Sequence, residues 1–337
     1  MVNIGVIGCG HWGPNLIRNF QHIEGARVLF ACDLDKSRLD HMAKLYPAVP
    51  RTRDYRTILE SQEVDAVCVA TPAGTHFQIA KDALLAGKHA LVEKPMTKSS
   101  REAQELIKLA KNKGRILMVS HTVEYNASVS ALRELVQKGE LGNILYISMT
   151  RLNLGIFRDD SNVVWDLCPH DISMAHSILG QSPITVQAIG AAHYKKGVAD
   201  VAFLFLSYPN DMFAHIHVSW IDPSKARRVV VVGDKKMALF DDLNDTEPLK
   251  IYGKNVAKPP YHDTFGDFKL LHNWGDVYAP KIQRGEPLAV ECAHFIDCVR
   301  RKTNPRSDGA SGLRVVQVLQ AAEESLQHNG RMVEIKS

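Results

Sequence analysis

Glycines at positions 8, 10 and 13 follow the short apolar run Val2 to Ile7 in the spacing G-x-G-x-x-G. Gly8 allows a tight turn out of a strand, Gly10 lets the backbone approach a pyrophosphate, and Gly13 lets a helix pack closely on the sheet. A helix starting here directs its free N–H groups towards phosphates. Asp33 ends the next apolar run and would accept hydrogen bonds from ribose hydroxyls. The pattern predicts a dinucleotide site that favours NAD, because Asp33 would repel the 2′-phosphate of NADP.

A lysine at the end of a later strand offers acid–base chemistry. Glu93-Lys94-Pro95 follows the run Ala90 to Val92, at the carboxyl edge where α/β sheets bind ligands. Oxidation of a secondary alcohol removes a hydride from carbon and a proton from oxygen, so a base must lie near the hydroxyl. Lys94 can take that proton or stabilise the developing alkoxide. Glu93 can orient Lys94, and Pro95 fixes the backbone after it, with a cis peptide as one means.

Asp166 and His170 form a second candidate pair, four residues apart. If the segment 164–179 is helical, the two share one face and can act as a proton relay in which Asp166 orients His170. Pro169 leaves open where this helix begins. The structural alternative is a capping aspartate and a core histidine. We predict no metal site, because His176 lies on another helical face and no cysteine has ligand spacing to the pair.

The first ~120 residues alternate strand and helix patterns, which predicts a parallel, doubly wound sheet. Val64 to Ala70 is an apolar run interrupted only by Asp65, typical of a strand buried on both faces. Ser99 to Glu102 is a capping box, and Gly114 ends the helix that follows. The expected fold class is therefore α/β Rossmann, with an NAD-binding domain at 1–122.

From about residue 143 the pattern changes to strands joined by hairpin signals such as Pro209-Asn210-Asp211 and Gly233 to Lys236. We expect a second α+β domain at 123–337, for substrate binding and oligomerisation, with a large, mostly antiparallel open sheet. The C-terminal helix at about 309–328 can pack back on the first domain. Helices are also expected near 164–179 and 288–302, and residues 253–286 are expected to be irregular. The strands of the second domain are expected at 144–150, 184–190, 201–207, 212–220 and 228–233.

Composition limits the classes of function. The chain has 337 residues, enough for two domains, with 45% hydrophobic and 23% charged residues. A net charge of +4 gives no case for nucleic acid but suits an anionic small substrate. No apolar run approaches the ~20 residues of a membrane span. The N-terminus begins directly in a strand, and the six cysteines lack C-x-x-C spacing, so we expect reduced thiols and a cytoplasmic protein.

Four motifs together resemble the glucose–fructose oxidoreductase/inositol dehydrogenase (Gfo/Idh/MocA) family over essentially the whole chain. They are the glycine motif, Ala70-Thr71-Pro72-x-x-x-His76, Glu93-Lys94-Pro95, and Asp166 to His170. The stretches 9–20, 164–171 and 219–223 are similar to one branch, which includes 3-dehydrogenases of UDP-N-acetylglucosamine and its uronic acid. The resemblance implies NAD as cofactor, a nucleotide sugar as substrate and a 3-keto product. That product would suit an aminotransferase acting in lipid A or surface polysaccharide biosynthesis.

The resemblance also implies roles for individual residues. Lys94, His170 and Asp166 would be catalytic. The cofactor-binding residues would be Gly8, Gly10, His11, Trp12, Gly13, Asp33, Thr71, Pro72, His76, Glu93, Lys94 and His121. Candidate substrate residues, beside Asp166 and His170, are Arg151, Asn153 and Arg158, as donors for two phosphates. His215, His217 and Ser219 line the polar face of one strand. In the family that face forms a subunit interface, so a dimer or tetramer is expected.

Several alternatives stay open on the sequence. The glycine turn could belong to an α/β protein without a cofactor. The enzyme could oxidise a free polyol such as inositol, or reduce a dTDP-keto-sugar. A different class is a non-catalytic NAD-binding regulator, since fold does not fix function. Lys94 with Asp166 and His170 argues against it, because a sensor needs no proton-handling groups.

Overall fold

The computed structural model describes residues 1–158, 161–257, 271–283 and 285–336. The chain forms two compact units. The first unit contains Met1–Tyr125 together with Gly285–Gln320, and the second contains Asn126–Arg284 together with Ala321–Lys336. The first unit thus includes a C-terminal segment as well as the N-terminal one.

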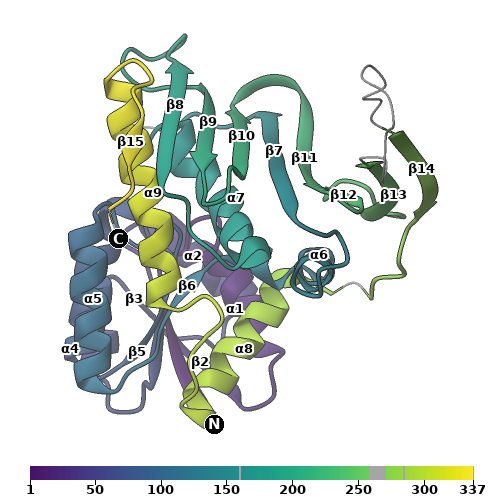
Figure 1. Cartoon of the computed structure of the whole chain (residues 1–337). Helices are drawn as coiled ribbons and strands as arrows, with labels where there is room; N and C mark the ends of the chain where they lie inside the picture. The colour runs from purple at the N-terminus through teal and green to yellow at the C-terminus, as the bar shows by residue number, and fades with distance from the viewer. Residues whose placement is uncertain (159–160, 258–270, 284, 337) are drawn as a thin grey trace, which may run out of the picture. The chain divides into compact units, whose positions relative to one another are not determined.

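The first unit is built on a parallel sheet with the strand order β3-β2-β1-β4-β5-β6 (Figure 1). Its strands are β1 (Val2–Ile7), β2 (Ala26–Cys32), β3 (Arg51–Thr52), β4 (Ala66–Val69), β5 (His89–Glu93) and β6 (Leu117–Ser120). The order reverses between β1 and β4. In open α/β sheets, ligands bind outside the carboxyl ends of the strands at such a reversal. This confirms the predicted doubly wound sheet and locates its binding edge at the turns after β1 and β4.

Helices cover both faces of this sheet. Their bounds are α1 (Gly13–Gln21), α2 (Lys36–Leu45), α3 (Tyr55–Glu60), α4 (Ala73–Leu85), α5 (Ser100–Lys113) and α8 (Pro287–Arg301), and the short helix η1 (Thr122–Tyr125) follows β6. One apolar cluster joins the sheet to α1, α2 and α8, where Phe20 meets Phe295 edge-on at 6.4 Å between ring centroids. A second cluster joins the other face to α3, α4 and α5. Burial of these apolar side chains fixes the strand ends that carry the candidate site.

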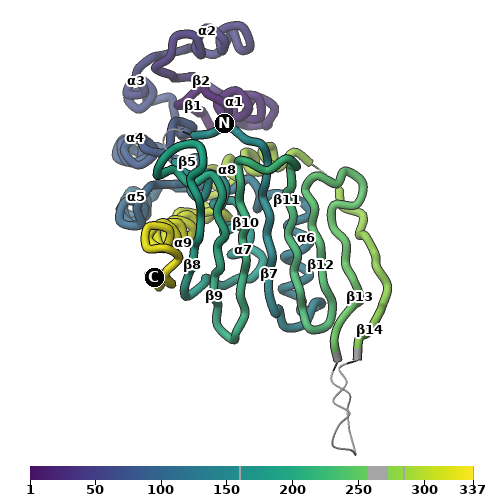
Figure 2. Tube along the Cα trace, turned by 90° about the horizontal axis from the view of Figure 1, so that it is seen from above, coloured from purple at the N-terminus to yellow at the C-terminus, as the bar shows by residue number. Residues whose placement is uncertain are grey.

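The second unit is a mixed sheet in the order β14-β13-β12-β11-β7-β10-β9-β8-β15. The strands are β7 (Ile144–Leu154), β8 (Thr185–Ala191), β9 (Val201–Ser207), β10 (Phe213–Ser219), β11 (Ile221–Gly233), β12 (Met237–Asp241), β13 (Leu249–Ala257), β14 (Leu271–Tyr278) and β15 (Val333–Glu334). Figure 2 shows α6 (Ala127–Gln137) and α7 (Val163–Leu179) beneath the sheet. Of the described strand pairs, β7 with β10 is parallel and the others are antiparallel. The expected mostly antiparallel sheet is confirmed.

The turn chemistry of the sequence is realised in this sheet. Asn210 and Asp211 both have positive φ, at 62° and 58°, between the antiparallel strands β9 and β10. A tight turn between antiparallel strands needs residues with positive φ, and Asn and Asp tolerate that conformation. The segment from Gly233 to Lys236 likewise joins β11 to β12 as an antiparallel pair.

The structure corrects one expectation. Residues 253–286 were expected to be irregular, but β13 and β14 are paired strands, and the register shifts between Tyr252 and Lys254. In this stretch Gly253 and Gly275 lie so close that a Cβ on Gly275 would be 2.4 Å from the carbonyl oxygen of Gly253. Glycine here permits close strand approach instead of breaking the strands. Residues 258–270 lie outside the described part. The sequence pattern also missed α6 and β12.

The six cysteines are all buried and free. Burial raises the pKa of each thiol, to about 12 for Cys9 and Cys32. They therefore act as small core side chains. Among the helices of the described chain, none is both long and apolar enough to cross a membrane. The remaining helix, α9 (Gly309–Gln327), begins in the first unit and ends in the second.

Candidate active site

The glycine loop after β1 forms a tight backbone cradle. Gly8 has φ +99°, and a Cβ there would lie 2.5 Å from the backbone of Ala70, in the turn after β4. A Cβ on Gly13, the first residue of α1, would lie 2.2 Å from the carbonyl oxygen of Gly8. Gly10 differs, because a Cβ added there would meet only the end of the Arg38 guanidinium, at 3.6 Å. Gly8 and Gly13 are thus required by the fold itself. Gly10 leaves the backbone before the N-terminus of α1 accessible. This arrangement fits the pyrophosphate of a dinucleotide.

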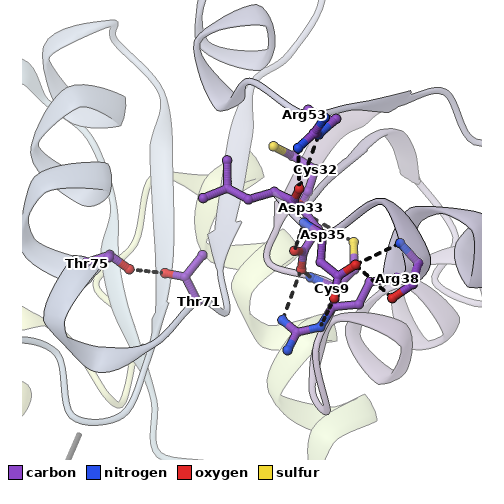
Figure 3. Close-up of polar contacts among 10 residues, drawn as sticks. Cys9, Cys32, Asp33, Asp35, Arg38, Arg53, Thr71 and Thr75 are labelled. Carbon is purple, nitrogen blue, oxygen red and sulfur yellow. Dashed lines mark hydrogen bonds and ion pairs between the residues drawn. The ribbon is translucent and has the colours of Figure 1, made fainter.

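Asp33 is held beside this loop by backbone donors (Figure 3). Its Oδ2 accepts the Cys9 N–H at 2.7 Å, and its Oδ1 accepts the Asp35 N–H at 2.9 Å. The Arg38 Nη1 lies 3.5 Å from Oδ2. The carboxylate is almost fully buried, whereas the Arg38 side chain is about half exposed. Sequence reasoning missed Arg38. The available signal was its position, five residues after Asp33 at the start of α2. Without the structure, however, a single arginine on a helix is interpreted as a solvated surface charge.

His11 and Trp12 complete the loop. His11 is exposed, and its ring meets the Trp12 ring edge-on at 5.1 Å between centroids. Trp12 packs against the apolar cluster under α1. The Asn15 side chain donates to the carbonyl oxygen of His11 at 2.9 Å. These contacts stiffen the segment between β1 and α1.

The segment Thr71-Pro72 after β4 is tied to Pro95 by one imidazole. His76 is buried, with Nδ1 2.8 Å from the carbonyl oxygen of Pro95 and Nε2 2.8 Å from that of Thr71. The Thr75 hydroxyl, also drawn in Figure 3, donates to the Thr71 hydroxyl at 2.7 Å. The structure thus shows His76 holding two loops together.

Glu93 is the last residue of β5, and Lys94 follows it directly. The peptide Lys94–Pro95 is cis, one of the arrangements that the sequence left open. Lys94 is half-buried, and Glu93 is buried with its Oε2 accepting the Lys94 backbone N–H at 3.2 Å. Burial raises the pKa of the Glu93 carboxyl to about 7, opposed by the neighbouring Lys94 charge. His121 is fully buried directly after β6, the strand that pairs with β5.

Sequence reasoning also missed Glu291, on α8. Its side chain is completely buried, and Oε2 accepts hydrogen bonds from the hydroxyls of Ser120 and Thr122, each at 3.0 Å. Burial and the nearby Glu93 raise the pKa of Glu291 well above its usual range. The contact joins residues 171 positions apart in the chain. The available signal was an acid on the apolar face of an amphipathic helix.

In the second unit, α7 carries Asp166 and His170. The Asn162 side chain caps α7 by accepting the N–H groups of Val164 and Trp165. The helix therefore starts at Val163, and Pro169 lies inside it, not in its first turn. Because the segment is α-helical, Asp166 and His170 share one face, as predicted.

The contacts of Asp166 bring further residues to this helix. Its Oδ2 accepts the indole N–H of Trp220 at 3.2 Å, and its Oδ1 lies 3.7 Å from the Arg158 Nε. Arg158 is exposed, which leaves most of its guanidinium available. Of the substrate candidates, Arg158 is thus next to a predicted catalytic residue in the same unit.

The other two substrate candidates lie on β7. Arg151 is buried and forms a two-point ion pair with Asp171, Nε to Oδ2 at 2.8 Å and Nη2 to Oδ1 at 3.0 Å. Such pairs fix a guanidinium rigidly. Most of the Arg151 side chain therefore lies in the interior of the second unit, where Asp171 binds it. A contact between Arg151 and the substrate stays a prediction. Asn153 is half-buried two residues further along.

Comparison with known proteins decides the family. Residues 2–121 match the oxidoreductase family with an NAD-binding Rossmann fold, Gfo/Idh/MocA, and residues 129–239 match the C-terminal domain of the same family. The chain belongs to the Gfo/Idh/MocA family. As a Gfo/Idh/MocA protein it is an NAD-dependent oxidoreductase.

Relatives within the Gfo/Idh/MocA family differ in substrate. The chain is 29% identical to a UDP-N-acetylglucosamine 3-dehydrogenase of Acidithiobacillus ferrooxidans, covering 96% of this chain and 98% of that protein. A solved structure of the A. ferrooxidans enzyme superposes with a TM-score of 0.79 at 27% identity, over 96% and 98% of the two chains. An inositol 2-dehydrogenase of Rhizobium meliloti is 21% identical, over 96% and 97%.

Proposed function

We propose that this enzyme oxidises a secondary hydroxyl of a nucleotide-linked amino sugar, C3 of a UDP-N-acetylglucosamine-type substrate, to the 3-keto sugar. The observation that carries the proposal is the end-to-end similarity to the UDP-N-acetylglucosamine 3-dehydrogenase. The alternative of a free polyol is tested below by the same experiment.

Lys94 is the first proton-handling residue of this proposal. NAD, when bound, supplies the acceptor for the hydride. Lys94 follows the carboxyl end of β5, at the edge of the sheet that holds the glycine cradle. Its amine takes the hydroxyl proton while the C–H electron pair leaves as hydride, so charge and protons balance. Its ammonium form then stabilises the alkoxide in the reverse direction.

His170 is the second proton-handling residue of this proposal. An imidazole can both accept and donate a proton, and we assign the orientation of His170 to Asp166, which lies on the same helical face. The Trp220 indole and the Arg158 guanidinium fix the Asp166 carboxylate in turn. We assign Arg158 and Asn153 to the phosphates and sugar of the substrate. In the first unit we assign the pyrophosphate to Gly10 and His11, and the adenosine ribose to Asp33.

We also infer that a second copy of the chain covers the outer sheet face of the second unit. On this face Phe203 stacks on His217 at 4.1 Å between centroids, Phe205 meets His215, and Tyr146 stacks on Phe213. Phe203, Phe205 and Phe213 are each about two-fifths exposed, although they pair across neighbouring strands. Contiguous exposed aromatic side chains of this kind mark association surfaces. Sedimentation velocity of wild type and of Phe205→Lys tests association through this face. A monomeric wild type would refute the inferred interface.

The proposed reaction is tested by absorbance at 340 nm with NAD and a panel of UDP-N-acetylglucosamine, its uronate, UDP-glucose, dTDP-glucose, myo-inositol and glucose. Because 3-keto formation can be uphill, the ketone is trapped or consumed by an aminotransferase with glutamate. NADH formed only with a UDP-N-acetyl sugar supports the proposal. NADH formed only with free polyols refutes the substrate class but keeps the family chemistry. Lys94→Met should abolish turnover, and wild-type turnover in it would refute the role of Lys94.

A further inference from the structure

The rings of Phe157, Trp220 and Tyr194 lie in contact beside the Asp166 carboxylate of the second unit. The Phe157 ring meets the buried Trp220 ring at 5.6 Å and the Tyr194 ring edge-on at 5.3 Å between centroids. The Trp220 indole donates to the Asp166 Oδ2 at 3.2 Å. We call Phe157, Tyr194 and Trp220 the aromatic corner. Its contacts run from a predicted catalytic carboxylate to a ring on the protein surface.

The outer end of the aromatic corner leaves a large apolar area in contact with water. Tyr194 is 75% exposed, and Phe157 is 39% exposed. Leu154 and Ile156, which precede Phe157 in the same segment, are also highly exposed. Exposed side chains contribute little to the stability of the fold, because their apolar area is not removed from water. Contiguous exposed apolar side chains of this kind mark a binding surface.

The loop that carries Tyr194 is held in place by the buried carboxylate of Asp200. The Asp200 Oδ2 accepts the backbone N–H groups of His193 and Tyr194, at 2.7 and 3.1 Å. Its Oδ1 accepts the His193 imidazole Nδ1–H at 2.7 Å. The Asp200 carbonyl oxygen also accepts the backbone N–H of Trp220 at 2.9 Å. These bonds fix the exposed tyrosine relative to the aromatic corner, so a ligand that binds there loses little of its binding free energy to ordering the loop.

Cations flank the aromatic corner and indicate the kind of ligand. Arg158 follows it directly in the chain, and the Arg158 Nε lies 3.7 Å from the Asp166 Oδ1. Lys195 and Lys196 follow Tyr194 in the loop, and both are exposed. Guanidinium and ammonium groups bind phosphates, and aromatic side chains stack on the planar bases of nucleotides. A nucleoside diphosphate carries both kinds of group, whereas a free polyol carries neither.

We propose that the aromatic corner binds the base of the nucleotide sugar. The planes of Phe157 and Tyr194 differ by 68°, so a base that stacks on Tyr194 meets Phe157 with its edge. The diphosphate then lies along Arg158, and the sugar reaches Asp166 and His170. The order of the three parts of the ligand follows the order of the contacts in the second unit. This inference rests on the proposed function, since it adds the site for the nucleotide part of that substrate.

Calorimetry with uridine diphosphate (UDP) and with inorganic pyrophosphate tests the proposal without turnover. The full chain is first saturated with NAD, so that neither probe binds at the glycine loop. Tyr194→Ala should raise the Kd for UDP about 5- to 100-fold, because the base loses its stacking partner. Tyr194→Phe keeps the ring and should stay within about twofold of wild type. Pyrophosphate, which has no base, should bind both variants as it binds wild type.

Tyr252→Ala is the matched control, because this tyrosine of the second unit lies on β13, three positions from β7 in the sheet order. It should leave the Kd for UDP unchanged. In turnover, Tyr194→Ala should raise the KM for UDP-N-acetylglucosamine by about the same factor as the Kd for UDP, with little change in kcat, since the base is remote from the reacting carbon.

The outcomes separate this inference from the proposed function. Equal UDP affinity in Tyr194→Ala and wild type overturns the base site, while turnover of UDP-N-acetylglucosamine would still support the proposed function. A wild type that does not bind UDP and oxidises only free polyols refutes both. UDP binding that depends on Tyr194, in an enzyme that oxidises a different nucleotide sugar, keeps the base site and refutes the assigned sugar. An altered sedimentation coefficient in Tyr194→Ala with unchanged UDP affinity would assign the exposed rings to a contact between copies of the chain, and would overturn the inference.

Discussion

The imidazole of His76 joins Pro95 to the turn after β4: Nδ1 is 2.8 Å from the Pro95 carbonyl oxygen, and Nε2 is 2.8 Å from that of Thr71. Carbonyl oxygens only accept, so the ring satisfies both when both nitrogens carry hydrogen. This side chain therefore sets the position of the backbone that follows Lys94. A residue that the sequence suggested as a cofactor contact has a demonstrable structural connection as well.

Replacement of His76 by Ala should lower the free energy of unfolding by about 2–4 kcal/mol, because the buried imidazole and its contacts to the Thr71 and Pro95 carbonyls are lost. It should also lower kcat/KM with little effect on NAD affinity. Thr75→Val is the matched control on the same turn of α4. Thr75 is exposed and bonds only within its own segment, to Thr71 and Pro72, so its loss should cost less than about 1 kcal/mol. Chemical denaturation of both variants measures these losses of unfolding free energy. Equal losses in the two variants would refute the bridging role of His76.

Two glycine substitutions should separate folding from cofactor binding. Gly13→Ala introduces a Cβ 2.2 Å from a backbone oxygen and should lower the melting temperature of the cofactor-free protein. Gly10→Ala meets only the end of a flexible arginine at 3.6 Å, so the melting temperature should stay unchanged. NAD affinity, measured by calorimetry, should nonetheless fall at least about tenfold in Gly10→Ala, because its methyl group faces the pyrophosphate. Unchanged affinity there would contradict the assignment.

Coenzyme preference should depend on Asp33 and Arg38 together. Asp33→Ser removes the carboxylate that we assign to the ribose hydroxyls and leaves Arg38 beside a neutral side chain. The kcat/KM for NAD should fall about 10- to 100-fold, in line with hydrogen bonds to a charged group worth about 1.5–3 kcal/mol. Turnover with NADP should rise, because a guanidinium binds phosphate. The double variant Asp33→Ser with Arg38→Ala should lose the increased turnover with NADP. If the increase remained, Arg38 would not be the residue that binds the 2′-phosphate.

Glu93 should impose a pH dependence on stability. Its folded-state pKa of about 7 lies above the ordinary 4.5, so between these values the folded state holds a proton that the unfolded state has lost. Stability from this group is present at low pH and is lost as the pH rises from about 4.5 to 7, by up to about 3 kcal/mol. His89, whose pKa burial lowers to about 4, gives the opposite slope over an overlapping range.

The difference between Glu93→Gln and wild type cancels the contribution of His89. The relative stability of the variant should rise between about pH 4.5 and 7 and stay level above pH 7. Urea titrations at half-unit intervals measure it. A difference that does not vary with pH would show that the Glu93 pKa is not raised.

The parts that were predicted from sequence are those with local causes. The strand–glycine–helix unit ending at Asp33, the hairpin turn at Asn210 and the helix around Asp166 each follow from patterns of a few residues. Glu291 could not be placed, since its partners lie 169 and 171 positions away and only tertiary packing brings α8 to β6. The strands β13 and β14 were missed because their glycines, which allow close pairing, resemble loop residues.

The positions of the buried thiols allow the local opening of each unit to be measured separately. Cys168 is the single cysteine of the second unit, and the other five lie in the first. A protonated, enclosed thiol reacts with an alkylating reagent only after local opening. The native protein should therefore resist labelling. Mass spectrometry of the peptide that carries Cys168 would measure the opening of the second unit independently of the first. Cofactor added during labelling would then reveal whether its binding slows one opening or both.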